Sequence, residues 1–408
     1  MYFTASGDKM KEYCFEKKYD VAVVGAGVAG IAAAVAAARR GRKTVLIEKQ
    51  TLIGGLATSG LIFVYLPLCD GNGRQVISGI SEEMIKKCCE FGPFDLPLRW
   101  GGTSTRTHRP AGRYEVEFSP AGFTLSLDEM LADAGVDLWL DSRVCDCIMQ
   151  ENSVTAVEVA NSNGMGIVRA DCFVDASGEA LLVRRAGGKV FYTENHQTMW
   201  AIETSVDCSR YHMTGDLHIN PFTYDEPDIP AGEAVDGKTV TAFTRTAWKH
   251  LREYYRENYA SGKVTSYENY PVHLPAMPQF RKIAAISGKT TLDTGDCFKH
   301  YEDSIGMTGD WRRSNGVVWE TPFSALLPEK IDGVFAAGRC MAAIGDAWEI
   351  YRVIPTAAMT GEAAGIAAAI ASENGCKASD VKAAEVQAAL KKLNVKLHLE
   401  EVGLTPQS

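Results

Sequence analysis

The fold of this chain is decided by residues 20–48, DVAVVGAGVAGIAAAVAAARRGRKTVLIE. Residues 20–24 form a short Val-rich run, which is typical of a fully buried parallel strand. Gly25 ends this run, and the Ala-rich residues 31–40 that follow are strong helix formers. Residues 44–47 form a second apolar run. The stretch therefore predicts a complete βαβ unit within about 30 residues.

Three glycines between the predicted strand and helix have the GxGxxG spacing of dinucleotide-binding folds. Gly25 permits a tight turn, Gly27 lets a pyrophosphate approach the backbone, and Gly30 allows close packing of helix and strand. Free N–H groups at the helix start would face the phosphates. Glu48 lies 18 residues after Gly30, where it would accept hydrogen bonds from a ribose and disfavour a 2′-phosphate. A helix start with packing glycines is the alternative, and the motif alone does not separate FAD from NAD.

Composition and charge limit the class of protein. The 408 residues are 46% hydrophobic and 23% charged, which excludes a disordered, collagen-like or coiled-coil chain and suggests two or three domains. The net charge of −9 argues against nucleic acid or an anionic membrane as the main partner. The first 19 residues lack the apolar run of a signal peptide, and no uncharged apolar stretch is long enough to predict a membrane span. The odd number of cysteines, 11, fits a reducing compartment, so we expect a cytoplasmic location.

The rest of the chain predicts how this unit is extended. Residues 154–159 and 166–172 flank a turn-forming tip and predict a β-hairpin, and residues 173–175 lead into a glycine turn. Residues 190–330 lack a βαβ rhythm, whereas residues 334–338 restore the buried-strand pattern. We therefore predict a dinucleotide-binding domain over 1–190, an inserted mixed α+β substrate or cap domain over 191–330, completion of the first domain over 331–375, and a C-terminal helical segment over 376–408.

Four later motifs bring the sequence close to a known family. A second βαβ half, expected of a nicotinamide dehydrogenase, is not apparent. Instead the chain carries GGLATSGL at 54–61, DASG at 175–178, AGRC at 337–340 and YRVIPTAAMTGEAAG at 351–365. With these motifs it resembles the FAD-dependent oxidoreductases of the glutathione-reductase type, and distantly the fumarate reductase and succinate dehydrogenase flavoproteins, over 20–60, 120–190 and 270–400. The resemblance implies an α/β fold, with a Rossmann-like parallel sheet and an antiparallel hairpin insertion.

The resemblance also implies a set of FAD-binding residues. Val144 would present its backbone to the adenine, and Arg339 stands where relatives have an acid, although an arginine can still reach a phosphate. The helix start at 354–356 would point at the flavin N1/O2 edge, where its dipole stabilises negative charge. Residues 50–66 hold no histidine for a covalent link, so we expect non-covalent FAD. The predicted cofactor-binding residues are Gly25, Gly27, Ala29, Gly30, Glu48, Lys49, Gly55, Leu56, Thr58, Val144, Ala176, Ser177, Gly178, Gly338, Arg339, Ile354, Pro355 and Thr356.

The predicted substrate residues rest on the same resemblance. Arg352 has an offset similar to that of an arginine that binds the substrate carboxylate in the fumarate-reductase flavoproteins; the alternative is a structural ion pair with Glu349 or Asp346. Arg281 lies where relatives place an arginine that reaches the flavin pocket. Tyr351 could donate a proton or a hydrogen bond, with core packing as the alternative.

Residues 99–113 are unusually basic for an acidic protein. They hold four arginines and one histidine, so they could form an anion-binding lid, or a solvated loop or subunit contact. His108 within them is a candidate general acid or base. No zinc or iron–sulfur spacing occurs, so we predict no metal, and Cys340 is expected to be an ordinary thiol.

Taken together, the sequence predicts an enzyme that moves a hydride between flavin N5 and a small polar, possibly anionic, carboxylate-bearing substrate. Three alternatives remain: a pyridine-nucleotide-linked reductase, which would need a second Rossmann unit, a tRNA-modifying flavoprotein, which would need a broad basic surface, and an electron-transfer subunit of a larger complex. The electron donor or acceptor, and whether the chain forms a homo-oligomer, are open.

Overall fold

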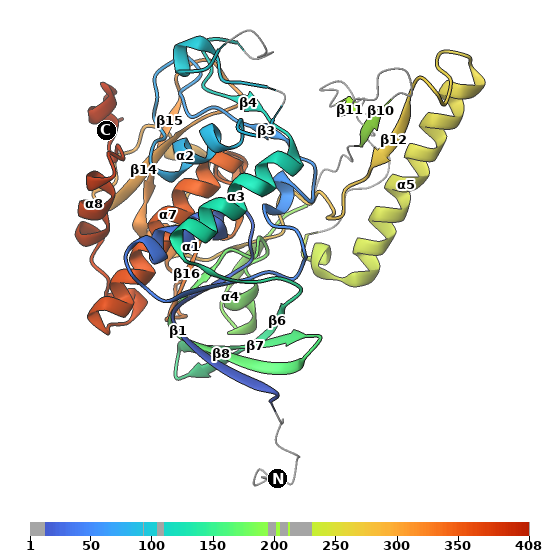
Figure 1. The fold of residues 1–408 in the computed structure, drawn as a ribbon. Coiled ribbons are helices and arrows are strands. Elements are labelled where there is room, and N and C mark those ends of the chain that lie inside the picture. Colours follow the sequence, from blue (N-terminus) through green and yellow to red (C-terminus); the bar gives the residue numbers. More distant parts are fainter. Residues whose placement is uncertain are drawn as a thin grey trace.

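The computed structural model describes residues 13–92, 94–103, 110–194, 201–204, 211–212 and 231–407. Its main body is built on a seven-stranded sheet with helices packed against it (Figure 1). The strands of this sheet, in spatial order, are β5 (Asp137–Trp139), β2 (Thr44–Ile47), β1 (Phe15–Val24), β8 (Gly164–Asp175), β7 (Ser153–Asn161) and β6 (Arg143–Gln150), with β16 (Val334–Ala336) also paired to β8.

One half of this sheet is parallel. β1 pairs in parallel with both β2 and β8, so Val24 lies beside Ile47 on one side and Asp175 on the other. β2 pairs in parallel with β5, and β16 pairs in parallel with the end of β8. Strands that are far apart in the sequence therefore end together, and in such sheets ligands bind at the carboxyl ends of the strands.

The other half is an antiparallel insertion. β7 and β8 form the predicted hairpin, with Asn161 opposite Gly164, and β6 continues the meander. β8 belongs to both halves, because its first residues pair with β7 and its last three pair with β16. β1 begins at Phe15, earlier than the apolar run predicts, since its polar first residues follow β8 into this insertion. The predicted fold class, an α/β fold with a hairpin insertion, is confirmed.

Two helices cross closely over the sheet. A Cβ atom added to Gly361 or Gly365 of α7 (Ile354–Asn374) would lie 2.1 Å from the carbonyl oxygen of Ala29 or Ala33 of α1 (Val28–Arg39). The glycines therefore let the two backbones touch. Within the described residues, α7 is the one helix long and apolar enough to span a membrane by length and composition, but 94% of its apolar window is buried inside the fold. It is a core helix in this structure.

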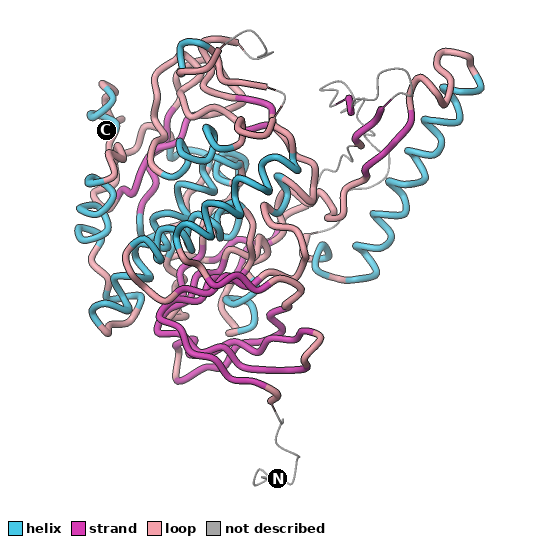
Figure 2. Tube along the Cα trace, viewed as in Figure 1, coloured by secondary structure: helices cyan, strands magenta, loops and turns pink. Residues whose placement is uncertain are grey.

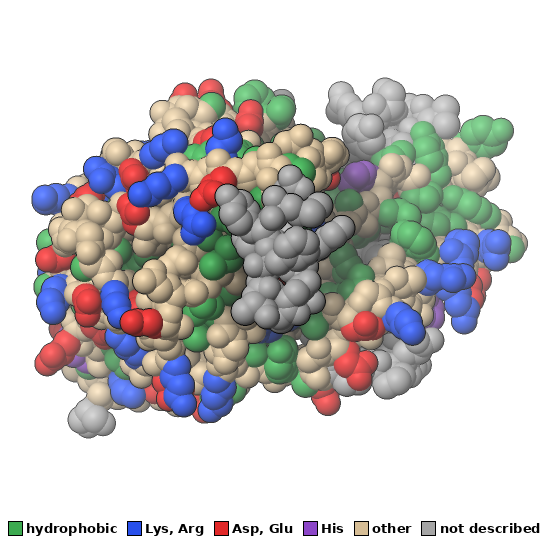
Figure 3. All heavy atoms as spheres, turned by 90° about the horizontal axis from the view of Figure 1, so that it is seen from below, with side chains coloured by type: hydrophobic (Ala, Val, Ile, Leu, Met, Phe, Trp, Pro, Cys, Tyr) green, Lys and Arg blue, Asp and Glu red, His purple; other side chains and the backbone are tan. Residues whose placement is uncertain are grey.

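A smaller lobe extends from the main body (Figures 1 and 2). It contains α5 (Gly237–Ala260) beside the antiparallel strands β11 (Tyr211–His212), β10 (Ile202–Thr204) and β12 (Tyr270–His273). Its own small apolar cluster gathers Ala247, Leu251 and Tyr255, and Figure 3 shows further hydrophobic side chains at its surface. Ala284 and Phe323, by contrast, pack in the core of the main body. The predicted domain boundaries at 190 and 330 stay predictions.

The remaining elements surround the sheet and close the fold. The C-terminal segment over 376–408, predicted to be helical, holds the α-helix α8 (Ala383–Lys392) between the short 3-10 helices Ala378–Asp380 and Leu399–Val402. The remaining helices and strands of the fold are β3 (Val64–Tyr65), α2 (Ile80–Lys87), β4 (Val116–Glu117), α3 (Pro120–Ala134), α4 (Leu181–Arg185), β9 (Val190–Tyr192), β13 (Ala284–Ile286), β14 (Ser304–Gly309), β15 (Val318–Pro322), α6 (Gly345–Tyr351) and α8 (Ala383–Lys392).

Glu362 makes the stability of α7 dependent on pH. Its side chain is buried, its Oε2 accepts the Ile80 N–H at 3.0 Å, and burial raises the pKa of its carboxyl from 4.5 to about 7. The pKa of the Glu362 carboxyl is higher in the folded chain than in the unfolded chain, so ionisation of this carboxyl opposes folding. The resulting loss of stability is absent at a pH below the unfolded pKa and complete at a pH above the folded pKa. We expect Glu362→Gln to raise the free energy of unfolding at about pH 8 by up to about 3 kcal/mol, and to leave it unchanged at about pH 4. Urea unfolding at both pH values measures this, and an equal effect at both would contradict it.

Candidate cofactor and substrate site

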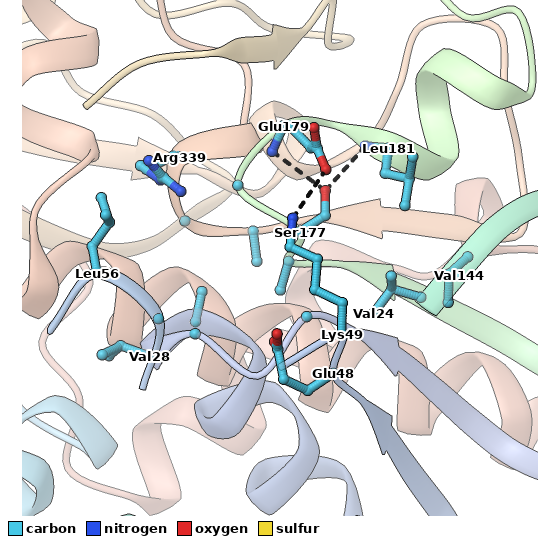
Figure 4. Close-up of a pocket in the computed structure, with 18 of the residues that line it drawn as sticks. Val24, Val28, Glu48, Lys49, Leu56, Val144, Ser177, Glu179, Leu181 and Arg339 are labelled. Carbon is cyan, nitrogen blue, oxygen red and sulfur yellow. Dashed lines mark hydrogen bonds and ion pairs between the residues drawn. The ribbon is translucent and has the colours of Figure 1, made fainter. Parts of the chain in front are cut away.

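A long cavity of about 640 Å³ lies along the carboxyl ends of β1, β2 and β8 (Figure 4). One end is lined by Arg143, Val144 and Cys145 of β6, and the other by Leu56, Ile354 and Ala357. The cavity therefore runs from the antiparallel insertion to the start of α7. Its length and position match the place where a doubly wound fold holds a dinucleotide.

The three motif glycines have different surroundings. Gly25 has a φ of +97°, and a Cβ there would lie 2.7 Å from the Ala176 carbonyl oxygen. A Cβ on Gly30 would lie 1.8 Å from the Gly25 carbonyl oxygen, so this glycine lets helix and strand touch. A Cβ on Gly27, in contrast, would meet nothing within 4 Å, and Gly27 lines the cavity. Open space next to this backbone fits a pyrophosphate group.

Two helix N-termini face the same cavity. Gly27 is the N-cap of α1, no side chain caps it, and no acidic residue lies in the first turn. Val353 is the N-cap of α7, again without a side-chain cap, and Ile354 and Ala357 of its first turn line the cavity. Unpaired N–H groups and the positive ends of two helix dipoles favour negative charge here. Phosphates at α1 and a flavin edge at α7 fit this field.

Glu48 lies at the end of β2 in the cavity wall (Figure 4). Its Oε2 accepts the Ala26 N–H at 2.7 Å and its Oε1 accepts the Gln50 N–H at 2.9 Å. The carboxylate therefore braces the glycine turn while it borders the cavity, as a ribose acceptor would. Opposite it, the Ser177 hydroxyl accepts the Leu181 N–H at 3.0 Å, which fixes the turn after β8.

Cys340 stabilises that same turn. Its Sγ accepts the N–H groups of Gly178 at 3.1 Å and Ala180 at 3.2 Å. Burial raises the pKa of the Cys340 thiol to about 12, so it stays protonated at neutral pH. This thiol serves as a buried hydrogen-bond partner, as the sequence predicts.

Arginines gather at the end of the cavity near the start of α7. Arg339 lies against Gly178, where an added Cβ would be 2.2 Å from its NH2, and it donates to the Phe280 carbonyl oxygen. Burial, followed by repulsion from Arg352 and Arg339, lowers the pKa of Arg281 to about 9. Arg281 therefore remains protonated at neutral pH, and the three guanidinium groups together form a positive region.

A second cavity of about 360 Å³ adjoins the first, because both are lined by Leu56, Ala57, Arg352 and Ile354. Its wall is apolar apart from Arg281 and Arg352. The guanidinium of Arg352 lies 6.0 Å from the centre of the Trp311 ring. The remaining lining residues are Ile62, Phe63, Val64, Leu66 and Val353.

Arg352 is held by a carboxylate. Its Nε and NH2 contact Glu349 at 2.7 and 2.6 Å, and Lys282 contacts the same carboxylate at 2.6 Å. Arg352 therefore makes the ion pair with Glu349 that one alternative predicts, and it also lines both cavities, while its contact with a substrate stays a prediction. Glu349 is shared between two cations, so it neutralises the arginine region only partly.

The structure brings most of the predicted residues together. Arg281 lines the second cavity and Arg352 lines both. The predicted cofactor residues that line the first cavity are Gly25, Gly27, Ala29, Glu48, Lys49, Gly55, Leu56, Val144, Ala176, Ser177, Gly178, Gly338, Arg339 and Ile354.

The other predicted residues that the structure describes do not line either cavity. Thr58 is buried and donates to the Ile53 carbonyl oxygen, and Thr356 lies with its hydroxyl 2.9 Å from that of Thr308. Pro355 is buried in the first turn of α7, and Gly30 packs on the glycine turn. His108 lies outside the described residues.

Tyr351 is also placed away from the cavities. It is fully buried, donates to the Glu320 carbonyl oxygen at 3.0 Å and receives a hydrogen bond from Thr321 at 3.1 Å. Both bonds are internal to the core. Its position fits core packing, and we propose no proton transfer by Tyr351.

Several lining residues were not found from the sequence. Met277 and Glu179 line the first cavity and Trp311 the second, while Lys282 holds Glu349. Three of these four come from residues 277–311, where no motif signals them. Only the folded chain brings this segment to the end of the cavity near the start of α7.

Comparison with known proteins agrees with this geometry. The family model described as FAD dependent oxidoreductase matches residues 20–200 and 192–390. A digeranylgeranylglycerophospholipid reductase of Picrophilus torridus is 30% identical over 192 residues, which cover 46% of this chain and 46% of that protein. An NADH:fumarate oxidoreductase of Klebsiella pneumoniae is 26% identical over 54% of this chain and 28% of its own length.

Among solved structures, a geranylgeranyl bacteriochlorophyll reductase-like protein of Thermoplasma acidophilum aligns over 93% of this chain and 84% of its own, with 18% identity and a TM-score of 0.45. The matched segments span about half the length of the digeranylgeranylglycerophospholipid reductases, 45% and 46% in two of them. The family model, in contrast, covers residues 20–390 without a gap. The chain therefore belongs to the FAD-dependent oxidoreductase family, and it is an enzyme with FAD as its cofactor.

Proposed function

We propose that this enzyme transfers a hydride between flavin N5 and a substrate that carries an anionic group beside an apolar body. The observation that supports this most directly is the second cavity, which opens onto the flavin end of the first and combines an apolar wall with Arg281 and Arg352. The arginines agree with the anionic substrate that the sequence predicts. The apolar wall favours a substrate with more hydrocarbon surface than a small polar molecule has.

The charge at this point favours an anion. Arg281, Arg339 and Arg352 lie close enough that the latter two lower the pKa of Arg281. Repulsion among three cations is relieved when a carboxylate or phosphate binds between them, and arginine can bind either group through two parallel hydrogen bonds. Glu349 fixes the orientation of Arg352 in advance.

Each part of the chain has a separate role in the proposed reaction. Bound FAD supplies the hydride chemistry. The arginines hold the anionic end of the substrate, so its reacting carbon is presented to the flavin in one orientation. The wall of Phe63, Trp311 and Val353 excludes water from that position. The N-terminus of α7 stabilises negative charge at the flavin edge.

The names of the relatives support both the anionic group and the apolar body of the proposed substrate. Their names specify a phospholipid with two geranylgeranyl chains in one case and fumarate in the other. One substrate has an apolar body and a phosphate, and the other has two carboxylates. Non-covalent FAD is part of the proposal, because the described residues that line the two cavities include no histidine. The electron partner, the oligomeric state and the cytoplasmic location stay predictions.

Substitution of Arg352 tests whether the enzyme recognises an anionic group on the substrate. We expect reduced, FAD-loaded enzyme to be reoxidised under anaerobic conditions by trans-2-octenoate, which combines a carboxylate, a reducible double bond and an apolar chain. Arg352→Ala should lower this rate by about 100-fold or more, because it removes a charged hydrogen-bond donor from a confined site, and Arg352→Lys should lower it less. Flavin absorption during stopped-flow mixing measures the rate.

The matched control is Arg313→Ala, since Arg313 is exposed and pairs with Asp310 outside both cavities. It should leave the rate unchanged. An unchanged rate in Arg352→Ala would contradict the proposal. So would reoxidation by the neutral methyl ester of 2-octenoate at the same rate as by the acid.

A further inference from the structure

Two histidines and one glutamate from distant parts of the chain meet near the C-terminal segment. His300 precedes β14, Glu320 lies within β15, and His398 immediately precedes the short 3-10 helix Leu399–Val402. One ligand atom of each lies within 4.8 Å of the other two. We call these three residues the His–Glu cluster. They line neither the cofactor cavity nor the apolar cavity beside it.

The carboxylate of Glu320 is fixed in position by the backbone. It is fully buried; its Oε1 accepts the Leu399 N–H and its Oε2 accepts the Tyr301 N–H, each at 2.8 Å. Each oxygen also faces one imidazole: Oε1 lies 3.5 Å from Nδ1 of His300 and Oε2 lies 3.2 Å from Nδ1 of His398. The backbone therefore orients the carboxylate so that both oxygens point towards a ring nitrogen.

The charge of this arrangement is not balanced by a permanent cation. A buried carboxylate is costly unless a positive group lies beside it. Within the described residues, the ion-pair partners of Glu320 are the two histidines, and neither carries a fixed charge as lysine or arginine does. Their rings lie 4.9 Å apart, so protonation of both would place two like charges side by side. A divalent cation bound to two neutral imidazoles and the carboxylate avoids this repulsion.

We propose that the His–Glu cluster binds a zinc ion. Nδ1 of His300 lies 3.5 Å from Oε1 of Glu320, Nδ1 of His398 lies 3.2 Å from Oε2, and one ligand atom of each residue lies within 4.8 Å of the others. Rotation of the side chains within this span can bring the three ligand atoms to ~2.1 Å from one zinc ion. Two imidazoles and one carboxylate are a ligand set that zinc accepts. The N–H groups of Leu399 and Tyr301 donate hydrogen bonds to the carboxylate and keep it in place. The side chain of His300 is 41% exposed, which gives the ion a path from solvent.

The fourth ligand can come from a neighbour or from water. Oε1 of Glu400 lies 3.9 Å from Nδ1 of His300, on an exposed side chain that can rotate towards the ion. Sequence spacing gave no sign of this site, because its three ligands are separated by 20 and 78 residues rather than by the short intervals of a zinc motif.

A bound ion would fasten the C-terminal segment to the β14–β15 hairpin. Hydrogen bonds already join these parts: the Ser304 hydroxyl donates to the Leu397 carbonyl at 2.6 Å, and the Gln407 N–H donates to the Phe298 carbonyl at 2.8 Å. The zinc would add a cross-link that closes long loops, so it would stabilise the folded chain independently of FAD.

Calorimetric titration of zinc chloride into the full-length, FAD-loaded enzyme, after treatment with EDTA, tests this site. We expect one equivalent to bind, cobalt to give the visible absorption of a tetrahedral site, and zinc to raise the melting temperature. His300→Ala and His398→Ala should each weaken zinc binding by at least about tenfold and remove the thermal shift. His273→Ala is the matched control, because His273 is exposed on β12 and lies outside the cluster.

Flavin absorption identifies which variants are folded. His300 is partly exposed, so His300→Ala remains informative even if His398→Ala does not fold. The proposal would be overturned if the wild type failed to bind one equivalent of zinc, or if folded His300→Ala bound it as tightly as the control. Because the readout is metal binding, loss of the site is distinguishable from failure of the proposed reaction.

Discussion

Gly27→Asp should yield a folded protein that no longer binds FAD. Gly27 is the N-cap of α1 with φ −72° and ψ 175°, a conformation open to any residue, and a Cβ there would meet nothing within 4 Å. Aspartate is also a favourable N-cap, so the apoprotein should keep its stability or gain roughly a few tenths of a kcal/mol. Its carboxylate would, however, project where the pyrophosphate binds and repel it. We expect FAD affinity to fall by about 100-fold or more, which is about 3 kcal/mol.

Gly237→Asp is the matched control for this experiment. Gly237 begins α5, an added Cβ there also meets nothing within 4 Å, and it lies outside both cavities. This variant should bind FAD as the wild type does. FAD titration of the apoproteins, followed by flavin fluorescence, gives the affinities, and thermal unfolding of the same samples gives the stabilities. Wild-type FAD affinity in Gly27→Asp would mean that the pyrophosphate does not lie at α1.

Gly365→Ala should strongly destabilise the folded chain. Alanine normally stabilises a helix interior relative to glycine by about 1 kcal/mol. Here the added Cβ would lie 2.1 Å from the Ala33 carbonyl oxygen, so α1 and α7 must separate. We expect the free energy of unfolding to fall by about 3 kcal/mol. Urea unfolding of the apoprotein measures this fall without a contribution from FAD.

Ala33 does not line the cofactor cavity, so the loss should come from packing rather than from the cofactor site. Gly237→Ala adds the same methyl group to α5 in open space and should cost no stability. If Gly365→Ala proved as stable as Gly237→Ala, the close crossing of α1 and α7 would be wrong.

The sequence allowed the βαβ unit, the β7–β8 hairpin and the late strand β16 to be predicted, because each depends on local periodicity or on glycine spacing. The pairing of β16 with the end of β8 brings together residues about 160 positions apart, and no local signal encodes such a contact. Similarly, Arg281 and Trp311 meet Arg352 only in the folded chain.

Some side chains lie where the sequence predicts and others do not, and the difference has a physical reason. Most of the residues predicted to bind the cofactor line the first cavity, because glycine spacing and strand ends fix where such a cavity forms. Tyr351 and Arg352 are neighbours in the sequence, yet one lies in the core and the other in the cavity wall. Tyr351 is the last residue of α6 and Arg352 is its C-cap, so the packing of this helix end decides the direction of each side chain.

The absorption spectrum of the purified protein, recorded again on the supernatant after acid precipitation, tests the central claim most directly. Bound, non-covalent FAD in the cavity along β1, β2 and β8 predicts flavin bands in the native protein that pass entirely into the supernatant. Flavin that remained in the pellet would contradict the non-covalent site. A colourless protein that took up no added FAD would contradict the account of the cavity itself.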